Sequence, residues 1–440
     1  MNCNFFKKEP FIYMFNKINI RDKETFHNII WRGIHIFGTK GITFLIFIIC
    51  AKLLNAFDFG LYNYVLTIAF FLIIFTDFGI SKASSKYVAE YNAVNKEKLK
   101  SVLFNAALII LMLSCVISLL VLFLGRFIFS NQYLLYIYYL LPLLFFAPLS
   151  FLYDGIYRGL KKFKELSIIS LIVSSVSLGF VFILVDKYKL TGALIAQNLF
   201  YFLLFIALTI RYKNFNFKID KKIIKEIGKY SLFIGVAGIF AFFTWRVDIL
   251  FLGHYNFIKE IGFYEIAYKI LALFIIPFTI IGQVIAPDIT KYFSTKNYFL
   301  VNIKFKKYLF FSIIVSTVFL LMFILLKHKI FSLFFNKYYT NDMKHLLIVM
   351  LPLYFTSMLL GMVSPFAVST GHAKMGMHFL IIVGLLNLVF DYIFINLFDF
   401  WGLIYSTIII KCLGTIIFIY FYYKILRKLI LNRDSAFLPK

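Results

Sequence analysis

Residues 245–270 run from the end of one apolar stretch, across a short turn, into the next, and four ionisable side chains lie inside or at the edge of the apolar parts. They are Arg246, Asp248, Glu265 and Lys269. A charge in the hydrocarbon of a bilayer costs a few kcal/mol or more, so such residues are functional candidates by default. Arg246 and Asp248 are two positions apart and point away from each other on a helix, whereas Glu265 and Lys269 have the i, i+4 spacing of a local ion pair. The stretch predicts either charges that line a polar interior or a self-contained Glu265–Lys269 pair.

Other charges also interrupt apolar segments. Arg32 and Lys40 share a face of the first predicted helix. Arg32 is near the membrane edge, where an arginine can also reach the headgroups as an anchor. Lys40 is about 15 Å along the helix, which makes that reach much harder. Asp391 and Lys411 lie in the last two predicted helices, and a pair between them is one alternative.

The balance of these charges favours binding of an anion. The cations within predicted spans are Arg32, Lys40, Arg246, Lys269 and Lys411, and the carboxylates are Asp248, Glu265 and Asp391. Arginine can hold a phosphate through two parallel hydrogen bonds, and lysine supplies a point charge. We therefore predict that the five cations bind a phosphate-bearing substrate. The three carboxylates are predicted to couple transport to an ion or to pair with the cations.

The sequence contains no pattern typical of an enzyme. It has no glycine-rich GK[ST] loop for nucleotide phosphates. The histidines are not at metal-ligand spacings, and the four cysteines are far apart. We predict no catalytic residue, no metal site and no cofactor.

Composition places the chain in a membrane. It has 440 residues, of which 62% are hydrophobic, and its mean hydropathy is +0.88. Soluble domains are nearer 45–50% apolar. The net charge of +26 reflects basic loops between apolar helices rather than nucleic-acid binding, since no stretch is long and polar enough for such a domain. The polar, basic N-terminus does not have the pattern of a cleavable signal.

Apolar stretches of about 20 residues predict twelve membrane-spanning helices. They are near 30–51, 59–81, 102–124, 134–153, 166–185, 190–210, 230–253, 262–286, 308–326, 346–368, 376–397 and 401–423. Of the 46 lysines and arginines, 32 lie in the termini and the alternate loops on their side, including those near 82–100 and 211–229. Basic loops face the cytoplasm, so we expect both termini there.

The spans divide into two similar halves. We expect an N-terminal arm (1–29), a first six-helix lobe (30–210), a connecting loop (211–229), a second lobe (230–423) and a tail (424–440). The Leu-Pro-Leu sequence at 141–143 recurs 210 positions later at 351–353, and Gly192 recurs at Gly402. Gly60 and Tyr62 recur 202 positions later at Gly262 and Tyr264. Six helices is an even number, so the halves share one orientation, and a substrate would lie between them.

Short motifs along the chain resemble one membrane protein family. They are Phe59-Gly60-x-Tyr62, Asp77-x-Gly79 and Tyr87-Val88-Ala89-Glu90, then Asp248, Gly253, Gly262-x-Tyr264, Ala267, Lys269 and Pro287. The sequence resembles Wzx-type flippases of polysaccharide biosynthesis, in the multidrug/oligosaccharidyl-lipid/polysaccharide (MOP) exporter superfamily. The resemblance implies an all-α, MATE-like fold of twelve transmembrane helices in two pseudo-symmetric lobes around a central cavity.

The resemblance also implies a function. Such flippases move undecaprenyl-diphosphate-linked oligosaccharides of O-antigen type across the cytoplasmic (inner) membrane by alternating access. Their coupling is to protons or sodium, and their partner is a glycan polymerase or ligase. A MATE-type drug or cation antiporter and a peptidoglycan-precursor flippase share the architecture. A membrane glycan polymerase or ligase is the enzymatic alternative, for which the outer loop at 327–345 is short.

Overall fold

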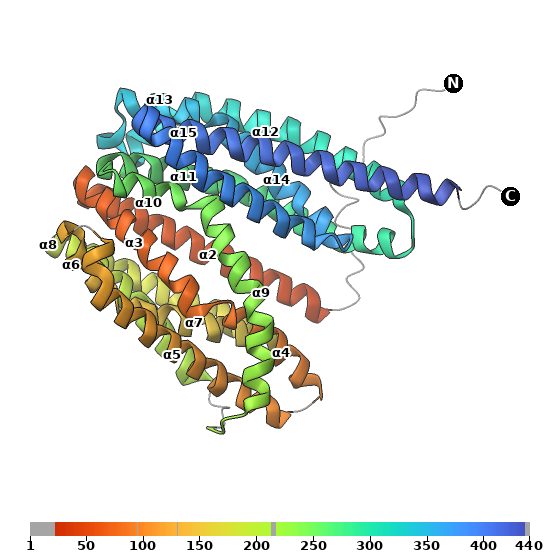
Figure 1. Ribbon diagram of the computed structural model, residues 1–440, viewed down its shortest axis with the longest axis horizontal. Coiled ribbons are helices and arrows are strands. Elements are labelled where there is room, and N and C mark those ends of the chain that lie inside the picture. The colour runs from red at the N-terminus through yellow and green to blue at the C-terminus, as the bar shows by residue number, and fades with distance from the viewer. Residues whose placement is uncertain (1–22, 95, 130, 213–216, 436–440) are drawn as a thin grey trace.

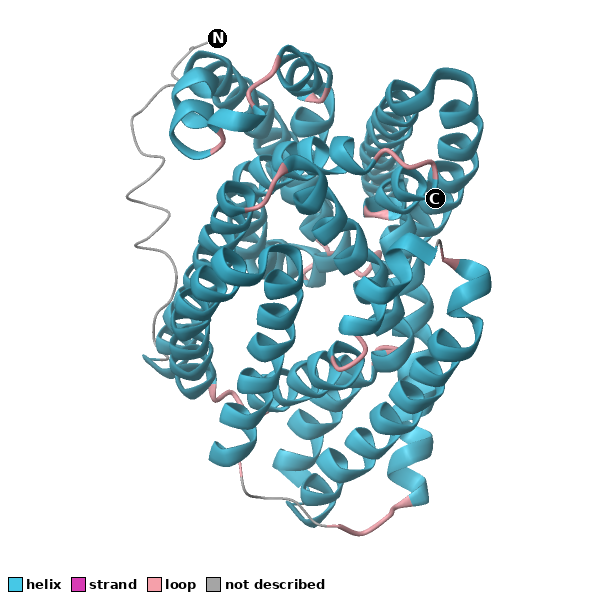
Figure 2. Ribbon diagram, turned by 90° about the vertical axis from the view of Figure 1, so that its left-hand side faces the viewer, coloured by secondary structure: helices cyan, strands magenta, loops and turns pink. Residues whose placement is uncertain are grey.

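The computed structural model describes residues 23–94, 96–129, 131–212 and 217–435. These residues form α-helices and one 3-10 helix, joined by short loops (Figure 2), and contain no strand. The helices are α2 (Lys23–Leu53), α3 (Ala56–Asp77), α4 (Ile80–Val94), α5 (Lys96–Ile128), α6 (Asn131–Tyr139), α7 (Leu143–Gly159), α8 (Phe163–Arg211), α9 (Lys221–Trp245), α10 (Val247–His254), α11 (Ile258–Ser294), α12 (Tyr298–Phe334), η1 (Asn336–Tyr338), α13 (Asn341–Val349), α14 (Leu351–Ser369) and α15 (Ala373–Ser435). Most of the predicted arm, 1–22, and the last five residues of the tail lie outside the described residues.

The described residues contain ten helical stretches that are long and apolar enough to cross a membrane. Two of these are interrupted. α8 has 49 residues, about 73 Å if straight, more than twice the ~30 Å hydrocarbon thickness. Non-helical backbone at Lys189 divides α8, and non-helical backbone at Phe398 and Asp399 divides α15. Each divided helix crosses twice, so twelve segments span the membrane, and the predicted all-α fold class is confirmed.

One predicted loop is largely helical. The region near 82–100 was expected to be a loop because it is rich in charge, but α4 covers its first half. Ile80, Ala83, Val88 and Tyr91 are buried along one face of α4, while its lysines lie on the other faces. This amphipathic pattern stabilises a helix that continues the membrane bundle beyond the hydrocarbon.

The two halves repeat at the level of local backbone. Shifting α6 by 210 positions gives the bounds of α13, and the same shift carries the start of α8 onto the start of α15. Lys189 (φ 49°) and Asp399 (φ 53°) are also 210 apart, and both have left-handed φ values. A methyl group on Gly192 or Gly402 would overlap a carbonyl oxygen eight residues earlier, of Leu184 and Phe394 respectively. The shared turn geometry therefore requires glycine at both positions.

The largest core cluster joins the two lobes at one end. One large cluster contains side chains from both halves, including Phe59 of α3, Val185 of α8, Tyr264 of α11 and Phe335 beside η1. Two smaller clusters lie at the other end: one centres on α4, α5 and α7 and also contains Ile223 and Ile227 from the start of α9, and the other centres on α11, α12 and α14. In Figure 1 the helices of the two lobes converge at the left and diverge toward the right. The joined end is opposite the end of the molecule where α2 begins and α15 ends.

Two repeat-related glycines meet at the joined end. The backbone nitrogens of Gly60 in α3 and Gly262 in α11 lie 3.4–3.5 Å from where a β-carbon would stand on the other residue. The two helices therefore cross at nearly backbone contact. Lys337, on η1, also donates to the carbonyl oxygens of Lys52 (3.1 Å) and Leu54 at the end of α2. Burial lowers the pKa of Lys337. Tight packing and this polar contact close the joined end.

Candidate functional site

The central feature of the site is a break in a membrane helix. A single helix was expected at 230–253, but α9 ends at Trp245 and α10 begins at Val247, because Arg246 has non-helical angles (φ −142°, ψ −6°). Asp248 lies in the first turn of α10, where its Oδ1 accepts a hydrogen bond from the backbone nitrogen of Ile249 at 3.0 Å. A carboxylate is favourable at a helix N-terminus, which carries partial positive charge. The break thus places one cation and one anion beside α11.

Arg246 pairs with Glu265 of α11. Arg246 Nη1 lies 2.8 Å from Glu265 Oε1; the Glu265 side chain is fully buried, whereas the Arg246 side chain is 28% exposed. The guanidinium also lies 5.2 Å from the centre of the Tyr268 ring. No ion pair joins Glu265 to Lys269 among the described residues, so the expected i, i+4 pair does not form. The helix break explains this, because it brings Arg246 to the carboxylate from another helix.

The remaining carboxylates form a second buried group. Asp248 Oδ2 accepts the hydroxyl of Tyr264 and lies 3.8 Å from the ammonium nitrogen of Lys411. Asp391 Oδ1 accepts hydrogen bonds from Ser406 and, at 3.3 Å, from Thr407. The ion pair of Lys411 is therefore with Asp248 and not with Asp391. The Lys411 ammonium and Asp391 Oδ2 are buried without a hydrogen-bond partner among the described residues.

Lys269 faces the first lobe. Its ammonium lies 5.6 Å from the ring centre of Phe47 in α2. The charge of Lys40, also in α2, is close enough to act on Lys269. Lys40 is exposed, Lys269 is partly exposed, and neither has a carboxylate within 4.0 Å in the described part of the chain. These two lysines bring positive charge from both lobes toward one region.

Arg32 belongs to a separate polar group on α2 and α7. Asp154 Oδ2 lies 2.6 Å from Arg158 Nη2, and Asp154 Oδ1 lies 3.8 Å from His35 Nε2. Arg32 is close enough for its charge to interact with Asp154 and Arg158. Asp154 and Arg158 are both only partly exposed. The sequence signal that could have indicated this polar group is the i, i+4 spacing of Asp154 and Arg158, together with Arg32 and His35 on the facing helix.

The charges divide unequally between the lobes. In the second lobe Arg246, Lys269 and Lys411 are matched in number by Asp248, Glu265 and Asp391. The excess of cations among the eight candidates comes from α2, through Arg32 and Lys40. The exposed or half-exposed members are Arg32, Lys40, Lys269 and Arg246, and these can reach a ligand. No group of histidine, cysteine or carboxylate side chains within the described ranges is arranged to hold a metal.

Solved structures of transporters share the fold. An inward-facing multidrug resistance MATE family transporter of the MOP superfamily aligns with a TM-score of 0.72 and 15% identity, over 89% of this chain and 95% of that one. An outward-facing transporter described in the same terms gives a TM-score of 0.61 and 16% identity, over 91% and 96%. A MOP superfamily transporter from Pyrococcus furiosus, whose title reports reversed polarity of the binding pocket, gives 0.61 and 18%, over 92% and 96%.

Sequence comparison identifies the family. No curated protein sequence matches the chain. The MatE family profile matches residues 233–393. The profile described as "Polysaccharide biosynthesis protein" matches residues 26–293, more than half of the chain and including the Arg246–Glu265 pair. The fold and both profiles are those of membrane transporters and flippases rather than enzymes. The chain therefore belongs to the polysaccharide biosynthesis protein family, within the MOP superfamily.

Proposed function

We propose that this protein is a flippase for oligosaccharides linked to undecaprenyl diphosphate. It would act in the cytoplasmic membrane, with both termini in the cytoplasm, and pass its substrate to a glycan polymerase or ligase. The observation that carries the proposal is that Lys40 of α2 and Lys269 of α11, from opposite lobes, are near enough for their charges to interact, and that neither forms an ion pair among the described residues, although the charge of Glu265 also acts on Lys269. A diphosphate supplies the missing negative charge.

Arg246 is the third proposed contact to the diphosphate. Its ion pair with Glu265 fixes the guanidinium, and its partial exposure leaves donors for a phosphate. Arg32, with Arg158 and His35 near the end where the lobes diverge, would meet the headgroup earlier. Lys411 is only 4% exposed, so we assign it to the buried carboxylates rather than to substrate contact.

The arrangement of the cores supports alternating access. The joined core and the Gly60–Gly262 crossing hold one end together, while at the other end the lobes have their own core clusters, with the start of α9 packed on the first lobe. The excess of lysine and arginine in the loops at this end supports a cytoplasmic location for it. The higher TM-score to an inward-facing transporter (0.72) than to an outward-facing one (0.61) agrees with this state. The headgroup would enter a central cavity between the lobes while the polyprenyl tail stays in lipid.

Coupling to a proton or sodium gradient is assigned to the buried acids. Asp248, Asp391 and Lys411 lie on α10 and on the two segments of α15, and Asp391 Oδ2 lacks a partner. Glu265 is the third acid, although Arg246 already neutralises it. A change in protonation or ion occupancy here would alter how α10 packs on α15. Measuring flipping with imposed pH or sodium gradients tests this assignment.

A drug or cation antiporter is the second candidate, because the MatE profile matches the second lobe. A cationic substrate needs an accessible carboxylate. Asp248, Glu265 and Asp391 are all fully buried, and the first two are paired with the chain's own cations. We therefore favour an anionic substrate. Drug-resistance measurements on cells that express the protein distinguish the antiporter from the flippase. A peptidoglycan precursor is a related lipid-linked substrate, and complementation of a strain that lacks its peptidoglycan-precursor flippase tests it.

We predict that Lys40→Ala and Lys269→Ala each reduce flipping of undecaprenyl-diphosphate-linked sugar in proteoliposomes about 10-fold or more. A hydrogen bond to a charged group is worth roughly 1.5–3 kcal/mol, which corresponds to that range. Lys52→Ala is the matched control, because Lys52 is also exposed on α2 but lies at its far end. Normal flipping by the Lys40→Ala/Lys269→Ala double variant would contradict the proposed cationic site.

A further inference from the structure

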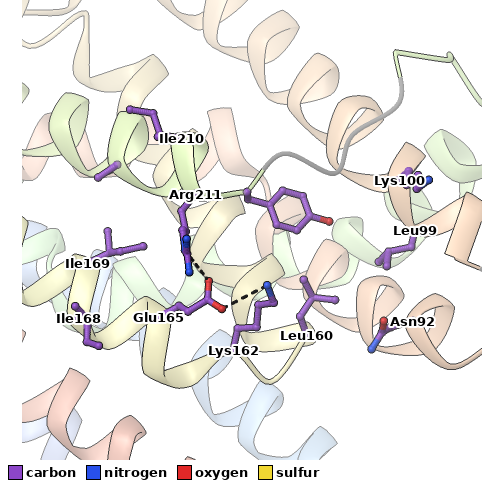
Figure 3. A pocket seen from close by; sticks show the side chains of 12 residues that line it. Asn92, Leu99, Lys100, Leu160, Lys162, Glu165, Ile168, Ile169, Ile210 and Arg211 are labelled. Carbon is purple, nitrogen blue, oxygen red and sulfur yellow. Dashed lines mark ion pairs between the residues drawn. The ribbon is translucent and has the colours of Figure 1, made fainter.

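A pocket lies apart from the charge cluster. It has a volume of about 1060 Å³ and is formed where α4 ends, α5 begins and the two ends of α8 come together (Figure 3). It shares no residue with the proposed substrate site. Its polar part includes Lys100, Lys162, Glu165 and Arg211. Its lining residues belong to the first lobe and the start of the connecting segment, beside the core cluster that centres on α4, α5 and α7.

The polar part of the pocket has an excess of positive charge. In Figure 3 a single carboxylate, Glu165, lies between two cations: Lys162 Nζ and Arg211 Nε are each 3.5 Å from one of its oxygens. Lys100 has no ion pair among the described residues. The side chains of Lys162 and Arg211 are 45% and 66% exposed, and such exposed pairs contribute little and are readily exchanged. An incoming phosphate can therefore engage both cations and replace the shared carboxylate.

The rest of the pocket is apolar. Leu99, Ile168, Ile169, Ala207 and Ile210 line it. Ile168 and Ile210 are 39% and 65% exposed. Each lies within one helical turn of a charged lining residue, Glu165 and Arg211 respectively, so apolar and charged side chains are adjacent in the pocket. A soluble anion would gain nothing from these side chains, and the volume is far larger than one phosphate requires. A phosphate attached to acyl chains matches both parts of the pocket.

We propose that this pocket binds an anionic phospholipid of the cytoplasmic leaflet, with the headgroup phosphate on Lys162, Arg211 and Lys100 and an acyl chain along Ile168, Ala207 and Ile210. Basic pockets between transmembrane helices on the cytoplasmic side are suited to such headgroups. The bound lipid would link the start of α5 to both ends of α8. This site is distinct from the proposed glycan site and does not depend on it.

The test measures lipid binding by the purified full-length protein with native mass spectrometry, using phosphatidylglycerol and phosphatidylcholine. We expect selective retention of phosphatidylglycerol. Lys162→Gln/Arg211→Gln should weaken its binding about 30-fold, given the contribution of each cation near an anionic surface. Lys221→Gln/Lys222→Gln, which removes two exposed lysines at the start of α9 outside the pocket, should bind like the parent.

Two further arms separate the lipid from other ligands. Ala207→Phe changes no charge but fills the apolar part, and should also reduce phosphatidylglycerol binding. Glycerol 3-phosphate in large excess should not displace the lipid. Equal binding of the two phospholipids, equal loss in the two double variants, or displacement by glycerol 3-phosphate would each overturn the proposal. These measurements involve no glycan transport, so their outcome is independent of the proposed flippase function.

Discussion

Arg246→Ala is expected to abolish flipping and to lower the stability of the folded protein by about 3–5 kcal/mol, because it leaves a buried carboxylate without its partner. Glu265 is fully buried, and Arg246 is its only ion-pair partner in the described residues. The substitution also removes the guanidinium assigned to the diphosphate. Stability is measured as the fraction of monodisperse protein that remains after heating in detergent, and flipping is measured in proteoliposomes.

A double variant separates the two roles of Arg246. Arg246→Met/Glu265→Leu replaces the pair by apolar side chains, which often restores or raises stability. We expect this protein to survive heating like the parent but to flip its substrate at less than about a tenth of the parent rate, the loss corresponding to one charged hydrogen bond. If the double variant flipped its substrate at the parent rate, the role of Arg246 would be only to pair with Glu265 and not to bind the diphosphate. Parent-like heat resistance of Arg246→Ala would show that the pair does not stabilise the fold.

Much of the fold could be predicted because membrane helices follow simple rules. Apolar length placed the short connections at 186–189 and 398–400, where the structure breaks α8 and α15. The 210-residue recurrence of Leu-Pro-Leu and of glycine indicated the repeat that the bounds of α6 and α13 show. Both signals can be read directly from the amino-acid sequence, without knowledge of how the helices pack. Hydropathy is one-dimensional, so it could not reveal that α4 continues as a helix beyond the apolar stretch.

The pairing of charges could not be predicted in the same way. Spacing favoured Glu265 with Lys269, but non-helical backbone at one residue, Arg246, delivers another cation to Glu265. Lys411 similarly lies beside Asp248, 163 positions away, rather than Asp391. Such partners depend on how helices rotate and cross in three dimensions. The sequence identified which charged residues interrupt apolar segments, and the structure shows which of them are buried and which are exposed.

The crossing of α3 and α11 gives a sharp test of how the sealed end works. We predict that Gly60→Ala opens the joined end, because a methyl group there would overlap the carbonyl oxygen of Ile258. At Gly262 a methyl group would lie 3.3 Å from a Phe59 ring carbon and 3.4 Å from the carbonyl of Ala56, contacts that a small movement relieves. Gly262→Ala is therefore the matched control. Overpacking costs about 1–3 kcal/mol, enough to change a population ratio roughly 5- to 150-fold.

Spin labels at Tyr188 and Phe398, repeat-related positions that are both exposed, report the separation of the lobes at the sealed end once the native cysteines are replaced by serine. Pulsed electron paramagnetic resonance should give a longer distance distribution for Gly60→Ala than for the parent, and a parent-like one for Gly262→Ala. Flipping should fall with the first substitution only. Identical distributions in all three proteins would mean that close packing of α3 on α11 does not hold this end shut. A longer distance with undiminished flipping would mean that closure of this end is not a required step of transport, since alternating access needs each seal to form in turn.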